Sequence, residues 1–107
     1  MEAIAIAKVR IDEVGRLHVI PASNPNKMFR FIYRAAMEVD WDEEEQGFYT
    51  PVPRELSYSD WCLQVVAAVQ SEMGVSLRLE DATVWENVLP AVEQEIRRRV
   101  QPQIKQY

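Results

Sequence analysis

The stretch that decides the fold is "FRFIYRAAMEVDWD", residues 29–42, in which apolar and polar side chains alternate. Its odd-numbered positions are all apolar or aromatic: Phe29, Phe31, Tyr33, Ala35, Met37, Val39 and Trp41. A strand places all of them on one face, whereas a helix would scatter them around its circumference. The alternation therefore predicts an extended strand, with aromatic side chains inward and charged ones outward. The segment "RAAME" (34–38), taken alone, is also compatible with a helix.

An acidic run overlaps the end of this stretch and predicts the turn of a hairpin. Its six members are Glu38, Asp40, Asp42, Glu43, Glu44 and Glu45. After Gly47, the segment "FYTPV" (48–52) returns as a shorter strand. Pro51 and Pro53 restrict it to a sheet edge, because proline donates no ladder hydrogen bond. We expect a hairpin over 29–53 with a solvated acidic tip that discourages pairing between sheet edges.

The N-terminal residues predict a second hairpin, over 3–20. Its first strand alternates as expected, and Gly15 suits a turn with positive φ. Both sides of that strand begin with apolar residues, with Ile4 and Ile6 on one side and alanines on the other. A sheet with one buried face does not require this. We therefore expect a subunit contact to cover the extra side, and the protein to be a homodimer.

The strongest helix signal covers 58–73. Ser57 and Asp60 have the spacing of a capping box, and Gly74 is a typical C-terminal stop. Apolar residues at helical spacing form one broad stripe. They are Tyr58, Trp61, Cys62, Val65, Val66, Val69 and Met73.

A broken helix is predicted over 82–101. Proline is tolerated in the first turn of a helix but not in its interior, so Pro90 argues against one continuous helix. We expect a brief helical stretch over 81–85, a second helix from Val88, and a tail over 102–107.

These elements together predict a single α+β domain spanning residues 1–107. An antiparallel sheet of about four strands, made of the two hairpins, should carry two to three C-terminal helices on one face. Apolar residues make up 48% of the chain and charged residues 27%, which is typical of a globular protein.

Composition excludes several classes of protein. No apolar run approaches the roughly 20 residues that span a bilayer, and Glu2 stands where a signal peptide carries positive charge. A single cysteine cannot close an intramolecular disulfide, so we expect a cytoplasmic protein. The net charge is −5, and the two signs nearly balance once the acidic run is set aside. We therefore expect no nucleic-acid partner and no membrane partner.

No catalytic or metal-binding constellation stands out in the sequence. Counted from Asp40, a calcium loop would need glycine at the sixth position and glutamate at the twelfth, where Glu45 and Pro51 stand. Loose Ca²⁺ or Mg²⁺ binding by Asp40, Asp42 and Glu44 stays open, although a solvated turn explains these carboxylates better. His18 has no nucleophile nearby in the sequence, and Cys62 lies in the apolar stripe of a helix. We predict no catalytic residue, no metal and no cofactor.

Charged residues on the outer face of 29–42 leave one enzymatic alternative open. They are Arg30, Arg34, Glu38, Asp40 and Asp42. The arginines could tune a carboxylate for acid–base chemistry. An exposed ladder of opposite charges explains the same pattern more simply.

The order of motifs over 30–61 resembles a group of short uncharacterised bacterial proteins, some encoded by mobile integron gene cassettes. The resemblance rests on "YRAAME" (33–38), "VDWD" (39–42) and "PVPRELSYSDW" (51–61). It implies a compact α+β domain that self-associates. It implies no reaction and no active-site residue.

Two functions follow as hypotheses. In the first, the acidic run contacts a basic protein partner, so the chain is a non-enzymatic interaction protein of the mobile gene pool, of the immunity or antitoxin kind. In the second, the chain binds a cationic or aromatic small molecule in an aromatic pocket. The residues of that pocket would be Trp41, Trp61, Trp85 and Tyr33. Core packing of the tryptophans explains their spacing as well.

Overall fold

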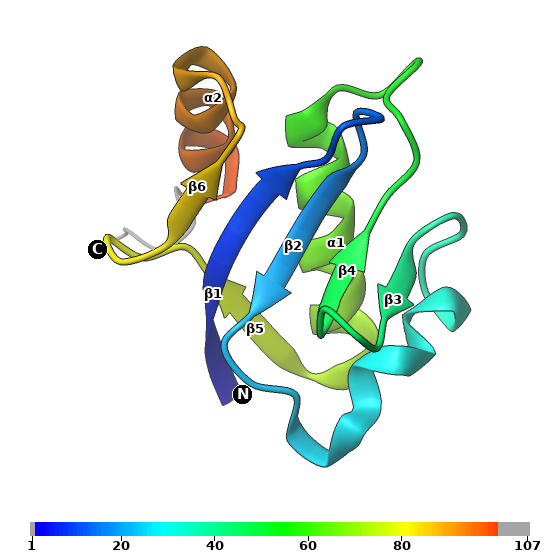
Figure 1. Cartoon of the computed structure of the whole chain (residues 1–107). Coiled ribbons are helices and arrows are strands. Elements are labelled where there is room, and N and C mark those ends of the chain that lie inside the picture. The colour runs from blue at the N-terminus through cyan, green and yellow to red at the C-terminus, as the bar shows by residue number, and fades with distance from the viewer. Residues whose placement is uncertain (1, 101–107) are drawn as a thin grey trace.

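A six-stranded sheet is the centre of the molecule, with helix α1 across one face and helix α2 packed on α1 (Figure 1). The computed structural model describes residues 2–100. The elements in chain order are β1 (Glu2–Ile11), β2 (Leu17–Pro21), the 3₁₀ helix η1 (Pro25–Arg34), β3 (Asp40–Asp42), β4 (Gly47–Tyr49), α1 (Tyr58–Met73), β5 (Val75–Arg78), β6 (Val84–Glu86) and α2 (Pro90–Val100). The predicted α+β class is confirmed.

Strand β1 organises the sheet, whose order is β3-β4-β2-β1-β5, with β6 also paired to β1. β1 runs antiparallel to β2, while its first half pairs parallel with β5 and its second half parallel with β6. The prediction of about four antiparallel strands is therefore wrong, because the sheet is larger and mixed. Segments as short as 75–78 and 84–86 carry too little periodicity to distinguish a strand from a link or a helix. Pairing with β1 makes them strands.

The prediction of one long strand over 29–42 is also wrong. Pro25–Arg34 form η1, which is interrupted by positive φ at Asn26 and Lys27. Only Asp40–Asp42 are extended, as β3, which pairs antiparallel with β4. The hairpin predicted over 29–53 is thus reduced to these two short strands and the acidic turn between them.

The spacing of the buried residues explains why this segment coils. Phe29, Ile32, Ala36 and Val39 all lie in the core, three or four positions apart, as on one side of a helix. The alternation at odd positions is misleading because some of those aromatic rings pack outside the core. The ring of Phe31 lies under the guanidinium groups of Arg30 and Arg34, at 4.9 and 4.7 Å from its centroid.

Strand β1 changes its inward face along its length. Ile4, Ile6 and Val9 are all buried, and the pairing with β2 shifts register between Ile6 and Lys8. This shift moves the inward position from even to odd numbers, so one chain buries the isoleucines as well as Val9. The apolar side from which we predicted a homodimer is thus already covered within a single copy.

Helix α1 forms where its local signals place it. Ser57 and Asp60 form both hydrogen bonds of the capping box, and Gly74 adopts a left-handed φ of 68° as the C-cap. Its buried face includes Trp61, Val65 and Cys62, whose thiol pKa burial raises to about 12. Cys62 is therefore a packed, unreactive side chain.

The C-terminal prediction needs two corrections. The helical stretch expected over 81–85 is instead a turn followed by the start of strand β6, Val84–Glu86, and the second helix begins at Pro90 instead of Val88. The hydroxyl of Thr83 donates to the backbone oxygen of Ile6 at 2.7 Å, which fastens this segment to β1. The predicted tail over 102–107 lies outside the described residues. Within residues 2–100, no helix is both long and apolar enough to cross a membrane.

Substitutions in η1 test its helical geometry. Ile32→Ala should lower the free energy of unfolding by about 2–5 kcal/mol, the usual cost of emptying a core site. Tyr33→Ala should change it by less than about 0.5 kcal/mol, because that ring lies largely in solvent. Urea denaturation at low protein concentration measures both. If Tyr33→Ala instead lowered the free energy of unfolding more than Ile32→Ala, the segment would be the strand first predicted, with its odd-numbered residues buried.

Candidate functional site

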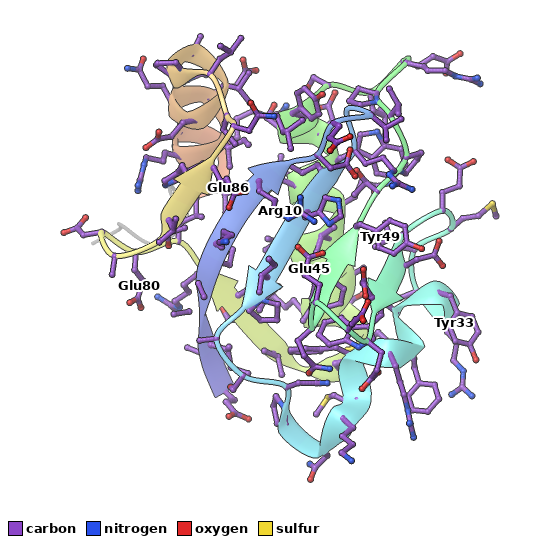
Figure 2. All side chains as sticks on the ribbon, viewed as in Figure 1. Arg10, Tyr33, Glu45, Tyr49, Glu80 and Glu86 are labelled. Atoms are coloured by element: carbon purple, nitrogen blue, oxygen red, sulfur yellow. The ribbon has the colours of Figure 1, made fainter. Side chains whose placement is uncertain are left out.

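A row of polar side chains crosses the sheet on the face that α1 does not cover. Residues paired across neighbouring strands share a face. The row consists of Glu86, Arg10, His18, Tyr49 and Asp40, on strands β6, β1, β2, β4 and β3. Figure 2 shows Glu86, Arg10 and Tyr49 following one another across the sheet, with Glu45 beside them. His18 is the centre of this row.

Both ring nitrogens of His18 contact a carboxylate. Nε2 lies 2.7 Å from Oδ2 of Asp12, and Nδ1 lies 2.8 Å from Oε1 of Glu45. His18 is 5% exposed. Tyr49 stacks on the imidazole at 5.8 Å between ring centroids, and the guanidinium of Arg16 lies over Tyr49. The imidazole is therefore stacked on one face and contacted by a carboxylate at each nitrogen.

Asp12 is positioned by the turn between β1 and β2. Its Oδ1 accepts the backbone N–H groups of Val14, Gly15 and Arg16, all at 2.9–3.0 Å. The φ of 104° at Gly15 gives the chain the conformation that this turn requires. The other oxygen, Oδ2, is left for His18 and for Nε of Arg16.

Glu45 comes from the turn between β3 and β4 and reaches back over β2. Oδ1 of Asp42 accepts the backbone N–H groups of Glu44 and Glu45, which fixes the turn. Gly47 allows the close approach that follows, because a Cβ atom there would lie 2.7 Å from Cγ1 of Ile20. Oε2 of Glu45 then accepts Nε–H of Arg10 at 2.6 Å.

The network is electrostatically satisfied. Burial would raise the pKa of Asp12, but hydrogen bonds from His18, Arg16 and the turn outweigh it and hold that pKa well below its usual range. The hydrogen bond to Glu45 raises the pKa of Arg10. Both imidazole nitrogens are engaged by carboxylates, so the ring of His18 on β2 links the two turns that carry Asp12 and Glu45. We call Asp12, His18, Glu45 and Arg10 the histidine clamp.

The acidic run is divided among three roles. Asp42 shapes the turn and Glu45 enters the clamp. Glu43 accepts the indole N–H of Trp41 at 3.1 Å. Glu38, Asp40 and Glu44 are exposed, and Glu38 has a positive φ of 74°. Among residues 2–100, no group of three His, Cys, Asp or Glu side chains is arranged to hold a metal ion.

The predicted charge ladder does not form. Arg30 and Arg34 project from η1, not from the strand that carries Asp40 and Asp42. In the described part of the chain, neither arginine forms an ion pair with a carboxylate. The ladder was predicted from a strand that does not exist.

The aromatic residues of the predicted pocket lie apart. Trp41 packs on Phe29 and Phe48 at one edge of the sheet. Trp85, on β6, lies beneath the guanidinium of Arg97. Tyr33 is exposed on η1 (Figure 2). No ring contact between residues 2 and 100 joins two tryptophans.

Trp61 alone, of these predicted pocket residues, lines an open cleft of about 540 Å³. The lining residues are Glu38, Pro51, Val52, Arg54, Glu55, Leu56 and Trp61. We call this the Trp61 cleft. It combines one residue predicted to bind a basic partner, Glu38, with one predicted to bind a small molecule.

No local pattern predicted the clamp, because the carboxylates that contact His18 lie six and twenty-seven positions from it along the chain. One member of the clamp, Asp12, does have a local sequence signal. Asp12 immediately precedes the Gly15 turn, and an aspartate at that place commonly accepts turn N–H groups.

These features define a small α+β protein with a mixed sheet, one helix-covered face and a charged network on the other. Residues 3–83 match the family model of the Integron Cassette Protein Hfx_Cass5. The chain belongs to this family, which confirms the resemblance inferred from its motifs.

One solved structure is also similar. It is the integron cassette protein Hfx_Cass5 from the mobile metagenome of the North West Arm sewage outfall, with 41% sequence identity and a TM-score of 0.45. The match covers 94% of this chain and 97% of that chain. No curated protein matches significantly.

Removing the Asp12 charge should weaken the fold in a pH-dependent way. Asp12→Asn should lower the free energy of unfolding at pH 7 by about 1–3 kcal/mol, the typical worth of hydrogen bonds to charged groups. The folded-state pKa is depressed below the unfolded value of about 3.9, so the unfolded chain binds more protons in this range. The contribution is complete above about pH 5 and is lost as the pH falls.

Urea denaturation between pH 7 and pH 3 measures this contribution. The gap between the wild type and Asp12→Asn should narrow towards acid. Asp81→Asn, at an exposed carboxylate, is the control and should leave stability unchanged. If the difference in unfolding free energy between the wild type and Asp12→Asn were the same at every pH, the Asp12 charge would not have the role described.

Proposed function

We propose that this chain is a non-enzymatic protein-interaction protein of the mobile gene pool, which binds a basic and partly apolar segment of a partner protein in the Trp61 cleft. The observation that carries the proposal is the composition of this cleft. Trp61, Leu56 and Val52 supply apolar wall, while Glu38 and Glu55 supply negative charge. A volume near 540 Å³ falls within the range of about 300–1,000 Å³ usual for binding sites.

The charge around the cleft favours a cationic occupant. Two carboxylates and one guanidinium, that of Arg54, line it. Asp40 is exposed on the neighbouring strand β3, and the whole chain carries a net charge of −5. Such a surface attracts a basic partner at long range and repels an acidic one.

The backbone at Glu38 is a second source of support. A positive φ on a residue other than glycine is uncommon, and such conformations gather at binding sites. Here the turn directs Glu38 to the cleft and leaves Met37 83% exposed. We expect Met37 to contact an apolar side chain of the partner, and the carboxylates of the cleft to contact lysine or arginine residues beside it.

The non-enzymatic part of the proposal rests on the histidine clamp. His18 directs both nitrogens at carboxylates, and no described serine or cysteine side chain hydrogen-bonds to it. A role of the immunity or antitoxin kind fits a partner that offers a basic segment. The single buried thiol of Cys62 suits the cytoplasm.

A small cationic ligand is the second candidate, because Trp61 lies in a cleft with two carboxylates. Of the four residues predicted for an aromatic pocket, however, three lie elsewhere. A single indole provides only part of the cage that encloses quaternary ammonium groups. We therefore favour the peptide segment.

Titration with short peptides tests the proposal. Peptides that combine lysine or arginine with leucine should change tryptophan fluorescence and bind by calorimetry, whereas glutamate-rich peptides of the same length should not. The double variant Glu38→Gln, Glu55→Gln should weaken binding about tenfold, as expected for two lost charge contacts. Glu72→Gln, an exposed carboxylate on α1, is the matched control.

Two outcomes would count against this function. If the double variant binds as the wild type does, the cleft is not the site. If small amines bind as tightly as the peptides, the ligand-binding alternative replaces the protein partner.

A further inference from the structure

Two groups of opposite charge near strand β3 form no ion pair among residues 2–100. The first is the arginine surface, which we define as Arg30, Phe31, Tyr33 and Arg34 on η1. The second is the glutamate tip, which we define as Glu43 and Glu44 in the turn between β3 and β4. Neither contributes to the Trp61 cleft.

The arginine surface is ordered by stacking instead of by ion pairing. The guanidinium groups of Arg30 and Arg34 lie 4.9 and 4.7 Å from the centroid of the Phe31 ring, and that of Arg34 lies 5.8 Å from Tyr33. Over the described residues, no carboxylate pairs with either arginine. Two stacked cations without a counter-charge present a surface prepared for carboxylates.

The glutamate tip is equally well ordered. Oδ1 of Asp42 accepts the backbone N–H of Glu44 at 2.9 Å, and Glu43 accepts the indole N–H of Trp41 and the side-chain amide of Gln46. Glu43 and Glu44 are exposed, and in residues 2–100 no lysine or arginine pairs with them. The turn therefore presents two exposed carboxylates that no lysine or arginine of the described residues neutralises.

Both groups lie near the same edge of the molecule. Helix η1 packs against β3, the edge strand whose following turn is the glutamate tip (Figure 1). Apolar surface accompanies them, because Tyr33 on η1 is 57% exposed. Charges of both signs together with an exposed aromatic side chain match the composition of a protein interface.

We propose that a second copy of this chain docks on the η1–β3 edge in a two-fold dimer, with the glutamate tip of each copy on the arginine surface of the other. A two-fold contact brings the same patch of both copies together, so one pairing is made twice. Tyr33 then supplies apolar area at the contact. The isoleucines of β1, which first suggested a dimer, take no part.

Charge complementarity selects a second copy over other occupants. A nucleic acid would be drawn to the arginines but repelled by the nearby glutamates. A uniformly basic protein would be drawn to the glutamates but repelled by the arginines. An occupant that carries both signs in the same arrangement satisfies both groups, and another copy of this chain does so by construction.

Complementary charge reversal tests the dimer. In about 0.05 M salt, the wild type should sediment as a dimer in analytical ultracentrifugation and dissociate in about 0.5 M salt, because exposed ion pairs are screened. Arg30→Glu with Arg34→Glu places acid against acid, and Glu43→Lys with Glu44→Lys places base against base. Each double variant alone should be monomeric, with a dimer dissociation constant raised at least about tenfold. An equimolar mixture of the two should form a heterodimer.

Controls separate this result from misfolding and from a general charge effect. Circular dichroism should show each variant folded. The neutral pairs Arg30→Gln with Arg34→Gln and Glu43→Gln with Glu44→Gln give a milder test in which both pairs weaken the dimer. Arg78→Glu and Glu72→Lys change exposed charges away from this edge and should leave dimerisation intact.

Three results would overturn the proposal. They are a wild type that is monomeric at low salt, reversed variants that remain dimeric, and a mixture that stays monomeric. If the arginine variant loses binding to a single-stranded oligonucleotide while its oligomeric state is unchanged, the surface is an anion site and not a dimer contact. Peptide binding in the Trp61 cleft can fail or succeed independently of all three.

Discussion

The bridge that Glu45 makes between His18 and Arg10 is the interaction on which the rest of the surface depends. One carboxylate from the β3–β4 turn contacts the imidazole of His18 on β2 and the guanidinium of Arg10 on β1, at 2.8 and 2.6 Å. The strands it secures are short, with three residues each in β3 and β4, so their ladder alone fixes them weakly. Both the Trp61 cleft and the η1–β3 edge adjoin these strands. The clamp therefore holds the surfaces to which we assign binding.

Local sequence signals predicted some elements correctly. Elements that depend on partners distant in the sequence were not predicted. Helix α1 was predictable because its capping box, apolar stripe and Gly74 stop lie within it. The hairpin of β1 and β2 was predictable for the same reason. Residues 75–78 and 84–86 form strands β5 and β6 because they pair with β1, and no local sequence pattern predicts that pairing. The strand prediction for residues 29–34 was wrong for a different reason. The helical spacing of Phe29, Ile32 and Ala36 was masked by an alternation of aromatic residues that does not reflect burial.

The same distinction applies to the candidate sites. The acidic run was visible, but its division among turn, clamp and exposed rim depends on the conformation at Asp42, Gln46 and Gly47. His18 looked isolated because folding, not sequence, brings Asp12 and Glu45 to it. Arg30 and Arg34 were noticed as charges, but their stacking on Phe31 and their lack of a carboxylate follow only from η1.

A double-mutant cycle on the histidine clamp tests this account most directly. His18→Gln, Glu45→Gln and the combined variant are compared with the wild type by urea denaturation at pH 7. If Glu45 holds the hairpins together through His18, the two losses of stability will be non-additive, with a coupling energy of about 1–3 kcal/mol. Losses that add to within about 0.5 kcal/mol would show that the two side chains act independently, and would contradict the clamp.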